Sequence, residues 1–183
     1  MTVLDDRPAT DRDIGVLPRE RWDPDQVADI AKFREQLDRY LTGELGEDVF
    51  RVFRLNNGIY GQRQGGTNQM VRVKLPYGTM TPEQLEMMGY IADRYSRGWG
   101  HITTRQNIQF HFVQLADIPD VMELMASVGV TSREACGDTV RNIQGCHLAG
   151  ACPYEDVDLS QRGERGDSYR LRNLNGQPLP PRL

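Results

Sequence analysis

The feature that most constrains the fold is the alternation of strand-like and helix-like patterns between residues 70 and 130. Residues 70–75 place apolar side chains at every second position, with Arg72 and Lys74 between them, which predicts a strand with one apolar face. The Thr-Pro-Glu-Gln segment at 81–84 is typical of a capped helix start. An apolar stripe at helical spacing follows, and Gly98 is expected to end that helix.

The second part of this region repeats the pattern. Residues 101–113 alternate as an extended segment does, and residues 118–128 again place apolar side chains at helical spacing. This order predicts an α+β protein, a ferredoxin-like half domain with a sheet of the β-α-β-α-β type and helices on one face.

The N-terminal part is less regular. Residues 1–21 have no clear periodicity and predict an irregular arm, whereas Asp23 begins a helical pattern that continues to about residue 45. A short strand over 52–55 and a Gly-, Asn- and Gln-rich loop over 56–67 are expected to lead into the sheet.

One face of the predicted sheet would be polar. Alternation gives an apolar set and a polar set, namely Ile108, Phe110 and Phe112 against Asn107, Gln109 and His111. If Arg105 already lies in the extended segment, its side chain joins the polar set, as do Arg72 and Lys74 from the earlier strand. A solvated face of an antiparallel sheet would look similar. Several cations without an acidic partner nearby favour anion binding instead.

Composition excludes several classes of protein. The length of 183 residues fits one domain with tails. A net charge of -4 and a pI near 5.4 argue against nucleic acid as the main partner. No apolar run approaches the roughly 20 residues of a membrane span. Met1–Asp13 resembles neither a secretory signal nor a transit peptide, so a cytoplasmic location is expected.

Two separated segments carry the side chains best suited to anion chemistry. Thr103–His111 reads Thr-Thr-Arg-Gln-Asn-Ile-Gln-Phe-His, and Gly137–Asn142 reads Gly-Asp-Thr-Val-Arg-Asn. Arg105 and Arg141 each offer a permanently charged, planar fork of donors that matches an oxyanion or a carboxylate. Taken singly, Arg105 would most often be a surface residue, and Arg141 could equally be an incidental arginine in a turn.

With Leu148-Ala149-Gly150, these segments resemble the pocket of the sirohaem-dependent nitrite and sulfite reductases, over roughly residues 45–158. The resemblance implies sirohaem and a 4Fe-4S cluster as cofactors, and the six-electron reduction of nitrite to ammonia or sulfite to sulfide. It also implies an electron donor, either ferredoxin or a flavoprotein. In the family, the arginine matching Arg105 contacts the substrate anion, and the one matching Arg141 faces substrate or a haem carboxylate. The resemblance does not decide between nitrite and sulfite.

Further residues are implied as cofactor contacts, because the many carboxylates of sirohaem need cations and amide donors around them. These are Arg63, Arg72, Lys74, Gln106 and Asn142. His111 could relay protons or could only make hydrogen bonds.

The cysteines are not assigned as metal ligands. Cys136, Cys146 and Cys152 are an odd number, which argues against a disulfide framework. The last two have a Cys-x5-Cys spacing, but zinc sites usually use tighter pairs and a four-iron cluster normally takes four thiolates. The resemblance implies that the cluster ligands lie in a C-terminal part of the complete enzyme.

The resemblance divides the chain into four parts. These are an arm and helix (1–45), the ferredoxin-like half domain (46–132), the start of the sirohaem-binding domain (133–158) and an irregular tail outside the family pattern (159–183). The leading interpretation is the N-terminal part of a reductase, incomplete and inactive by itself. The alternatives are a non-catalytic half-module that binds a tetrapyrrole or anion, and a truncated or frame-shifted remnant.

Overall fold

The computed structural model describes residues 16–136 together with Asn142, Gln144, Cys146, Leu148, Ala151, Pro153 and Tyr154. Within these residues, helices and strands follow the order η2 (Arg19–Arg21), α1 (Pro24–Leu41), α2 (Glu47–Asn56), β1 (Ile59–Gly61), β2 (Asn68–Val73), η3 (Pro76–Gly78), α3 (Pro82–Tyr95), β3 (His101–Ile102), β4 (Ile108–Gln114), η4 (Leu115–Asp117) and α4 (Ile118–Ala126). No described helix is long and apolar enough to cross a membrane.

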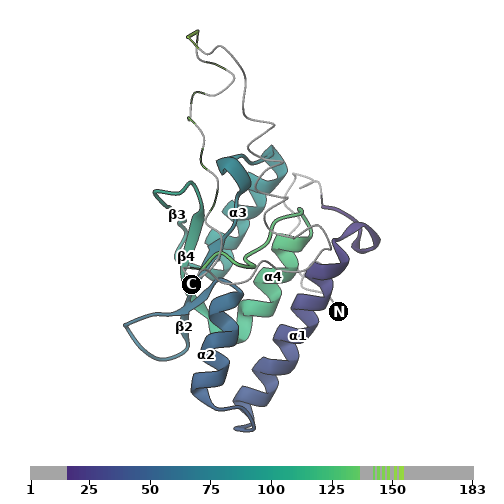
Figure 1. The fold of residues 1–183 in the computed structure, drawn as a ribbon, viewed down its shortest axis with the longest axis vertical. Helices are drawn as coiled ribbons and strands as arrows, with labels where there is room; N and C mark the ends of the chain where they lie inside the picture. Colours follow the sequence, from purple (N-terminus) through teal and green to yellow (C-terminus); the bar gives the residue numbers. More distant parts are fainter. Residues whose placement is uncertain are drawn as a thin grey trace.

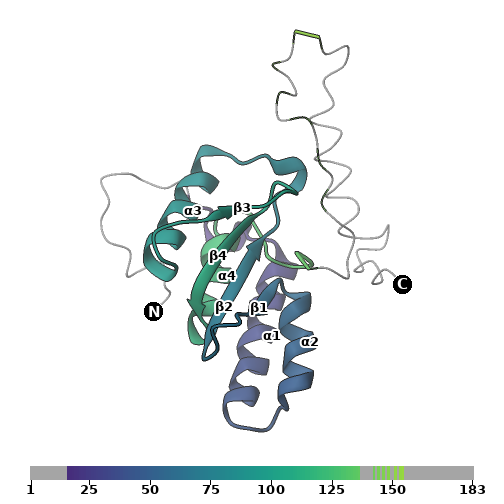
Figure 2. The ribbon, with the colours of Figure 1, turned by 90° about the vertical axis from the view of Figure 1, so that its left-hand side faces the viewer.

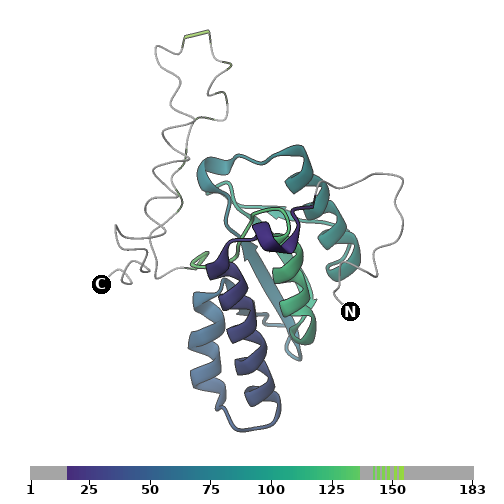
Figure 3. The ribbon, with the colours of Figure 1, turned by 90° about the vertical axis from the view of Figure 1, so that its right-hand side faces the viewer.

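The four strands form one sheet with the order β1-β2-β4-β3, and each neighbouring pair is antiparallel. The sheet lies along one side of the molecule (Figure 1). Figure 2 shows the strands in front of α4, and Figure 3 shows α1 and α4 in front of the strands. The predicted α+β half domain with helices on one face of its sheet is therefore confirmed.

The helix starts follow from local sequence. The Asp23 side chain accepts a hydrogen bond from the backbone N–H of Asp25, and Pro24 occupies the first position of α1. Thr81 and Gln84 form a reciprocal capping box at the start of α3. Both starts were predicted from the sequence, and both are confirmed.

The prediction of a strand at residues 52–55 is wrong, because these residues belong to α2. Short apolar runs do not distinguish strand from buried helix, and packing decides here. Phe50 is 1% exposed and its ring lies 6.2 Å from that of Phe33 in α1. Val49 and Val52 on the other face of α2 are largely exposed. The expected loop at 56–67 also contains β1.

A bulge in β4 changes the expected alternation. Val71 pairs with Phe110 and Gln69 with Val113, so two residues of β4 oppose the single residue Met70. Phe112 takes a φ of +64° in this bulge and lies outside the core, whereas Val113 is fully buried. The prediction that Phe112 continues the apolar face is therefore wrong.

The core is continuous through the layers. Side chains of α1, α2, the sheet, α3 and α4 belong to one cluster of buried apolar residues. Arg34 of α1 also forms ion pairs with Asp120 and Glu123 of α4, at 3.0 and 3.1 Å. The first long helix is thus packed onto the sheet domain.

Candidate functional site

The turn between β3 and β4 carries Arg105. Thr103 organises this turn: its N–H donates to the carbonyl of Asn107 at 2.8 Å, and its Oγ1 accepts from the N–H of Asn107 at 3.1 Å. The N–H of Gln106 donates to the carbonyl of Thr103 at 3.0 Å. Arg105 is half-buried at the tip. Our expectation that Arg105 lies in an extended segment is wrong, because the chain reverses there.

The second motif meets this turn. Asn142 Nδ2 lies 3.1 Å from the carbonyl oxygen of Arg105 and 2.6 Å from that of Leu75. Gln144 Nε2 donates to the carbonyl of Thr104 at 2.6 Å. Two segments far apart in sequence are therefore brought together, as the anion-site hypothesis requires. Arg141 itself lies outside the described residues.

A small cavity of about 10 Å³, room for about one water molecule, lies where the two segments meet. Its lining comes from β2, the β3–β4 turn and the chain after α4, namely Arg72, Lys74, Arg105, Asn107, Glu134, Ala135, Cys136 and Asn142. Three cations face this space: Arg72 of β2, Lys74 just after β2, and Arg105 of the turn. The parity prediction that Arg72 and Lys74 share a side of the sheet is consistent with this lining.

Arg72 is held in place by its neighbours. Its guanidinium lies 5.0 Å from the centre of the Tyr60 ring, and its Nη1 donates to the carbonyl of Ala135 at 3.4 Å. With the Gln109 amide turned so that its oxygen faces the guanidinium, that oxygen accepts at 2.6 and 2.8 Å. These contacts orient the charge without neutralising it.

Lys74 and Glu134 are oppositely charged residues in the lining of this cavity. Lys74 is only 4% exposed, and its backbone N–H donates to the carbonyl of Thr131 at 2.8 Å. Burial raises the pKa of the Glu134 carboxyl, while Lys74 and Arg133 act to lower it. Sequence reasoning missed Glu134, because it lies outside both motifs and reaches the cavity only through the fold.

Lys74 also borders a second cavity of about 640 Å³ between the starts of α1 and α3.

Of the other expected cofactor contacts, Asn142 belongs to the cavity lining, whereas Gln106 and Arg63 do not. Gln106 packs against η3, since a Cβ on Gly78 would lie 2.7 Å from the Cβ of Gln106. Arg63 is exposed in the connection between β1 and β2 and is not part of the cavity lining. The structure therefore does not bring Arg63 to the Arg105 site.

Backbone strain concentrates around this site. Tyr77, Gln106 and Glu134 have φ values of +59°, +60° and +55°, a region that non-glycine residues rarely adopt. Glu134 lines the cavity, Gln106 follows Arg105, and Tyr77 belongs to the loop against which Gln106 packs. Strained backbone is often retained at functional sites, where surrounding structure enforces it.

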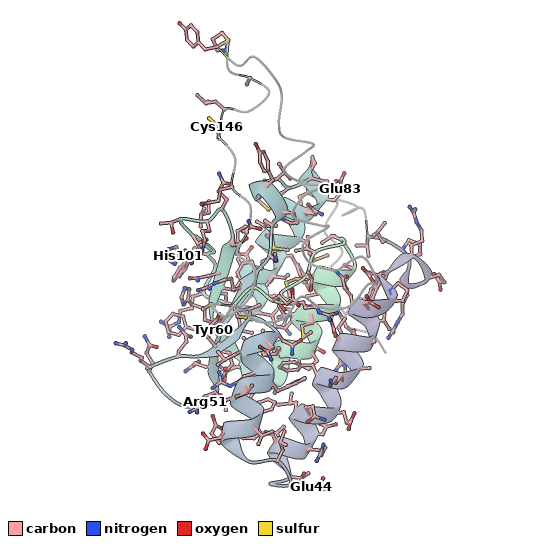
Figure 4. The ribbon with its side chains drawn as sticks, in the orientation of Figure 1. Glu44, Arg51, Tyr60, Glu83, His101 and Cys146 are labelled. Atoms are coloured by element: carbon pink, nitrogen blue, oxygen red, sulfur yellow. The ribbon has the colours of Figure 1, made fainter. Side chains whose placement is uncertain are left out.

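Charge is segregated along the chain. Residues 57–82 and 94–116, which contain all four strands of the sheet, have no Asp or Glu. Their cations are Arg63, Arg72, Lys74, Arg94, Arg97 and Arg105. Figure 4 shows Tyr60 and His101 on the sheet side of the molecule, and Arg51 and Glu44 towards the end formed by α1 and α2. A chain with net negative charge thus has a positive region around its sheet.

His111 is fixed by Gln62 rather than placed in the cavity. Gln62 Oε1 accepts from the backbone N–H of Phe112 at 2.7 Å, so its Nε2 faces His111 Nδ1 at 3.1 Å. The neutral ring therefore carries its proton on Nε2. Burial, and then the nearby His101, lower the pKa of His111. This environment fits a hydrogen-bonding histidine, the second of the two roles considered.

The donor set fits a polycarboxylate or a small oxyanion. Arg72, Lys74 and Arg105 supply donors and positive charge. The Glu134 carboxylate lies in the same lining, so the expectation that these cations have no acidic partner nearby is wrong. Within the described part of the chain, His, Cys, Asp and Glu side chains form no group of three that could hold a metal ion.

Comparison with known proteins defines first the class of domain. Residues 60–128 match the family described as the nitrite/sulfite reductase ferredoxin-like half domain. The structure of the Mycobacterium tuberculosis NirA protein has a similar fold, with a TM-score of 0.63 and 24% identity over 84% of this chain and 33% of that one.

Curated relatives then identify the family. The assimilatory ferredoxin-dependent nitrite reductase of Haloferax mediterranei is 35% identical over 76% of this chain and 26% of its own length. The chloroplastic ferredoxin–nitrite reductase of Spinacia oleracea is 42% identical over 77% and 24%. Sulfite reductase [ferredoxin] 1 of Mycolicibacterium paratuberculosis is 34% identical over 61% and 20%. The chain belongs to the nitrite and sulfite reductase family, and it spans about a quarter of the length of these relatives.

Proposed function

We propose that this chain supplies the ferredoxin-like half domain of a nitrite or sulfite reductase that carries sirohaem and a 4Fe-4S cluster. The observation that supports it best is the cavity where Arg72, Lys74 and Arg105 meet the second motif through Asn142. When bound, sirohaem and the cluster would pass electrons from the donor to the oxyanion during its six-electron reduction. Ferredoxin or a flavoprotein is the proposed electron donor, and the cytoplasm the proposed location.

The chain's own residues bind and orient anions. Arg105 and Arg141 are the proposed contacts to the substrate anion or to haem carboxylates. The proposed contacts to the cofactor's carboxylates are Arg72, Lys74, Gln106 and Asn142. Arg63 is also proposed to contact a carboxylate, from a position outside this cavity. Fixed cations beside the reacting oxyanion would stabilise negative charge as oxygen leaves as water, without reorganisation during the reaction.

The proposal can be tested on the purified chain by titration with sirohaem and with metal-free sirohydrochlorin, each followed by absorption. Because the proposed contacts recognise carboxylates, we expect saturable binding of both tetrapyrroles. Arg105→Gln should weaken binding roughly tenfold, since a hydrogen bond to a charged group is lost. Arg51→Gln is the matched control, because Arg51 is a half-exposed arginine of α2 that pairs with Asp48. Equal affinity of wild type and Arg105→Gln would remove Arg105 from the site.

A second function is favoured by one observation. Arg72, Lys74 and Arg105 gather around one cavity within the half domain itself, so a half-module could bind a tetrapyrrole or anion at this surface without catalysis. Saturable binding without reduction of nitrite or sulfite by the loaded chain, in the presence of a reduced ferredoxin, would support that function. No saturable binding by the wild-type chain would argue against both functions for this chain.

A further inference from the structure

We propose that Asn107 is a positioning residue, whose side-chain amide fastens the turn carrying Arg105 to the end of β2 and to the segment at Asn142. The inference rests on the proposed anion-binding function of Arg105. It adds a residue that lines the same cavity and acts on the anion site through the turn that it holds.

The side-chain oxygen of Asn107 contacts two hydrogen-bond donors from different segments. The residue is 7% exposed. Its Oδ1 accepts from the backbone N–H of Leu75 at 3.0 Å and lies 3.1 Å from Nδ2 of Asn142. An amide oxygen has two lone pairs, so it can accept from both of these donors. Its backbone N–H and carbonyl both bond to Thr103 across the turn.

Leu75 explains why an acceptor is needed at this point. The pairing of β2 with β4 ends at Val73 and Ile108, so the N–H of Leu75 has no strand partner in that ladder. Leu75 is 2% exposed, so its N–H is removed from water and needs a protein acceptor. Asn107 provides it from the neighbouring turn, and thereby ties the turn to the end of β2.

Asn142 completes a junction of three segments. Its Nδ2 has two protons and faces the carbonyls of Leu75 and Arg105 as well as Oδ1 of Asn107, at 2.6, 3.1 and 3.1 Å. The backbone of Arg105 is therefore held through Asn142, and Asn142 is held in turn by Asn107. A guanidinium on a fixed backbone loses less freedom when it binds an anion, which is the physical gain from this junction.

The inference is tested by hydrogen exchange and NMR on the whole chain. Asn107→Leu keeps the branched shape but removes both hydrogen bonds. We expect the Leu75 amide to exchange roughly tenfold faster or more, and the Arg105 side-chain Nε–Hε group to become more mobile in ¹⁵N relaxation. Asn107→Asp is the matched control: it retains the acceptor and should keep the Leu75 exchange rate within about twofold of wild type. If Asn107→Leu does not melt cooperatively, Asn107→Ser replaces it.

The possible outcomes separate positioning from support of the fold. Faster exchange at Leu75 with increased Arg105 mobility supports the proposal. Unchanged exchange at Leu75 overturns it, as does faster exchange with Arg105 as rigid as in wild type, because Asn107 would then only stabilise β2. Neither readout needs a ligand, so failure of the wild-type chain to bind a tetrapyrrole would count against the proposed function and leave this result intact.

Discussion

At the scale of single residues, burial and hydrogen bonding decide which polar groups can meet a ligand. Arg105 and His111 belong to the same sequence motif, yet Arg105 lines the cavity while His111 is fixed by Gln62 outside it. Spacing along the chain did not separate them, because a turn and a bulge lie between the two environments.

His111 gives the first prediction at this scale. Its pKa is lowered in the folded state, so the unfolded state binds more protons as pH falls below the ordinary value of 6.5. The free energy of unfolding should therefore decrease below pH 6.5 and be fully retained above it. Urea unfolding across this range would measure the effect. Protonation would also place a proton on Nδ1, against the amide of Gln62.

His111→Phe is the control for that measurement, since it keeps a ring beside Trp99 and His101. Its stability should depend less on pH in the same window. Asp29, Asp117 and Glu134 have raised pKa values, chiefly through burial, and remain in both proteins. Identical pH profiles for the two proteins would show that His111 does not titrate as we expect.

At the scale of elements, the site depends on how the chain after α4 packs against the sheet. Gly58 lies beneath this segment with φ +75°, and a Cβ there would lie 2.3 Å from the carbonyl oxygen of Ser132. The hydroxyl of Tyr60 and the guanidinium of Arg72 both donate to the carbonyl of Ala135, at 3.4 Å each. The absence of a side chain at Gly58 thus lets residues 132–135 pack closely against the sheet. This packing places Glu134 in the same cavity lining as Arg72 and Lys74.

Gly58→Ala should therefore cost more than backbone strain alone. We expect a loss of about 2 kcal/mol or more in the free energy of unfolding, measured by chemical denaturation. Gly43→Ala is the matched control, because Gly43 also has a positive φ but a Cβ added there would meet no atom within 4 Å. Its cost should be about 1 kcal/mol. Equal losses in the two variants would mean that the contact with Ser132 contributes nothing.

At the scale of the whole molecule, one core joins the N-terminal helices to the sheet. Phe33 of α1 is fully buried against Phe50 and Phe53 of α2, with ring centroids 6.2 and 5.5 Å away. The sequence divided the chain at residue 45, and that boundary stays a prediction. The continuity of the core favours unfolding as one unit across it.

Phe33→Ala tests this cooperativity. We expect the free energy of unfolding to fall by about 3–5 kcal/mol, because removal of a large buried ring leaves a cavity. The spectroscopic signals of the helices and of the sheet should change at the same denaturant concentration. Leu41→Ala is the control; Leu41 is 62% exposed and should change stability by less than about 0.5 kcal/mol. A sheet signal that stays at its wild-type midpoint while the helical signal shifts would instead show two independent units.

The sequence by itself determined the local features. Alternation located β2 and β4, capping residues located the starts of α1 and α3, and the motif around Arg105 indicated the family. These features depend on neighbours along the chain. Residues 52–55 were misassigned because a short apolar run is compatible with either strand or helix until its packing partner is known.

Only the tertiary structure decided which side chains share the site. It placed Arg105 in a turn, turned Phe112 out of the core through a bulge, left Arg63 exposed and brought in Glu134. It also joined Asn107 to Asn142 across 35 residues of sequence. The physical reason is that strand register, chain reversal and burial are settled by contacts between distant segments, which no local pattern specifies.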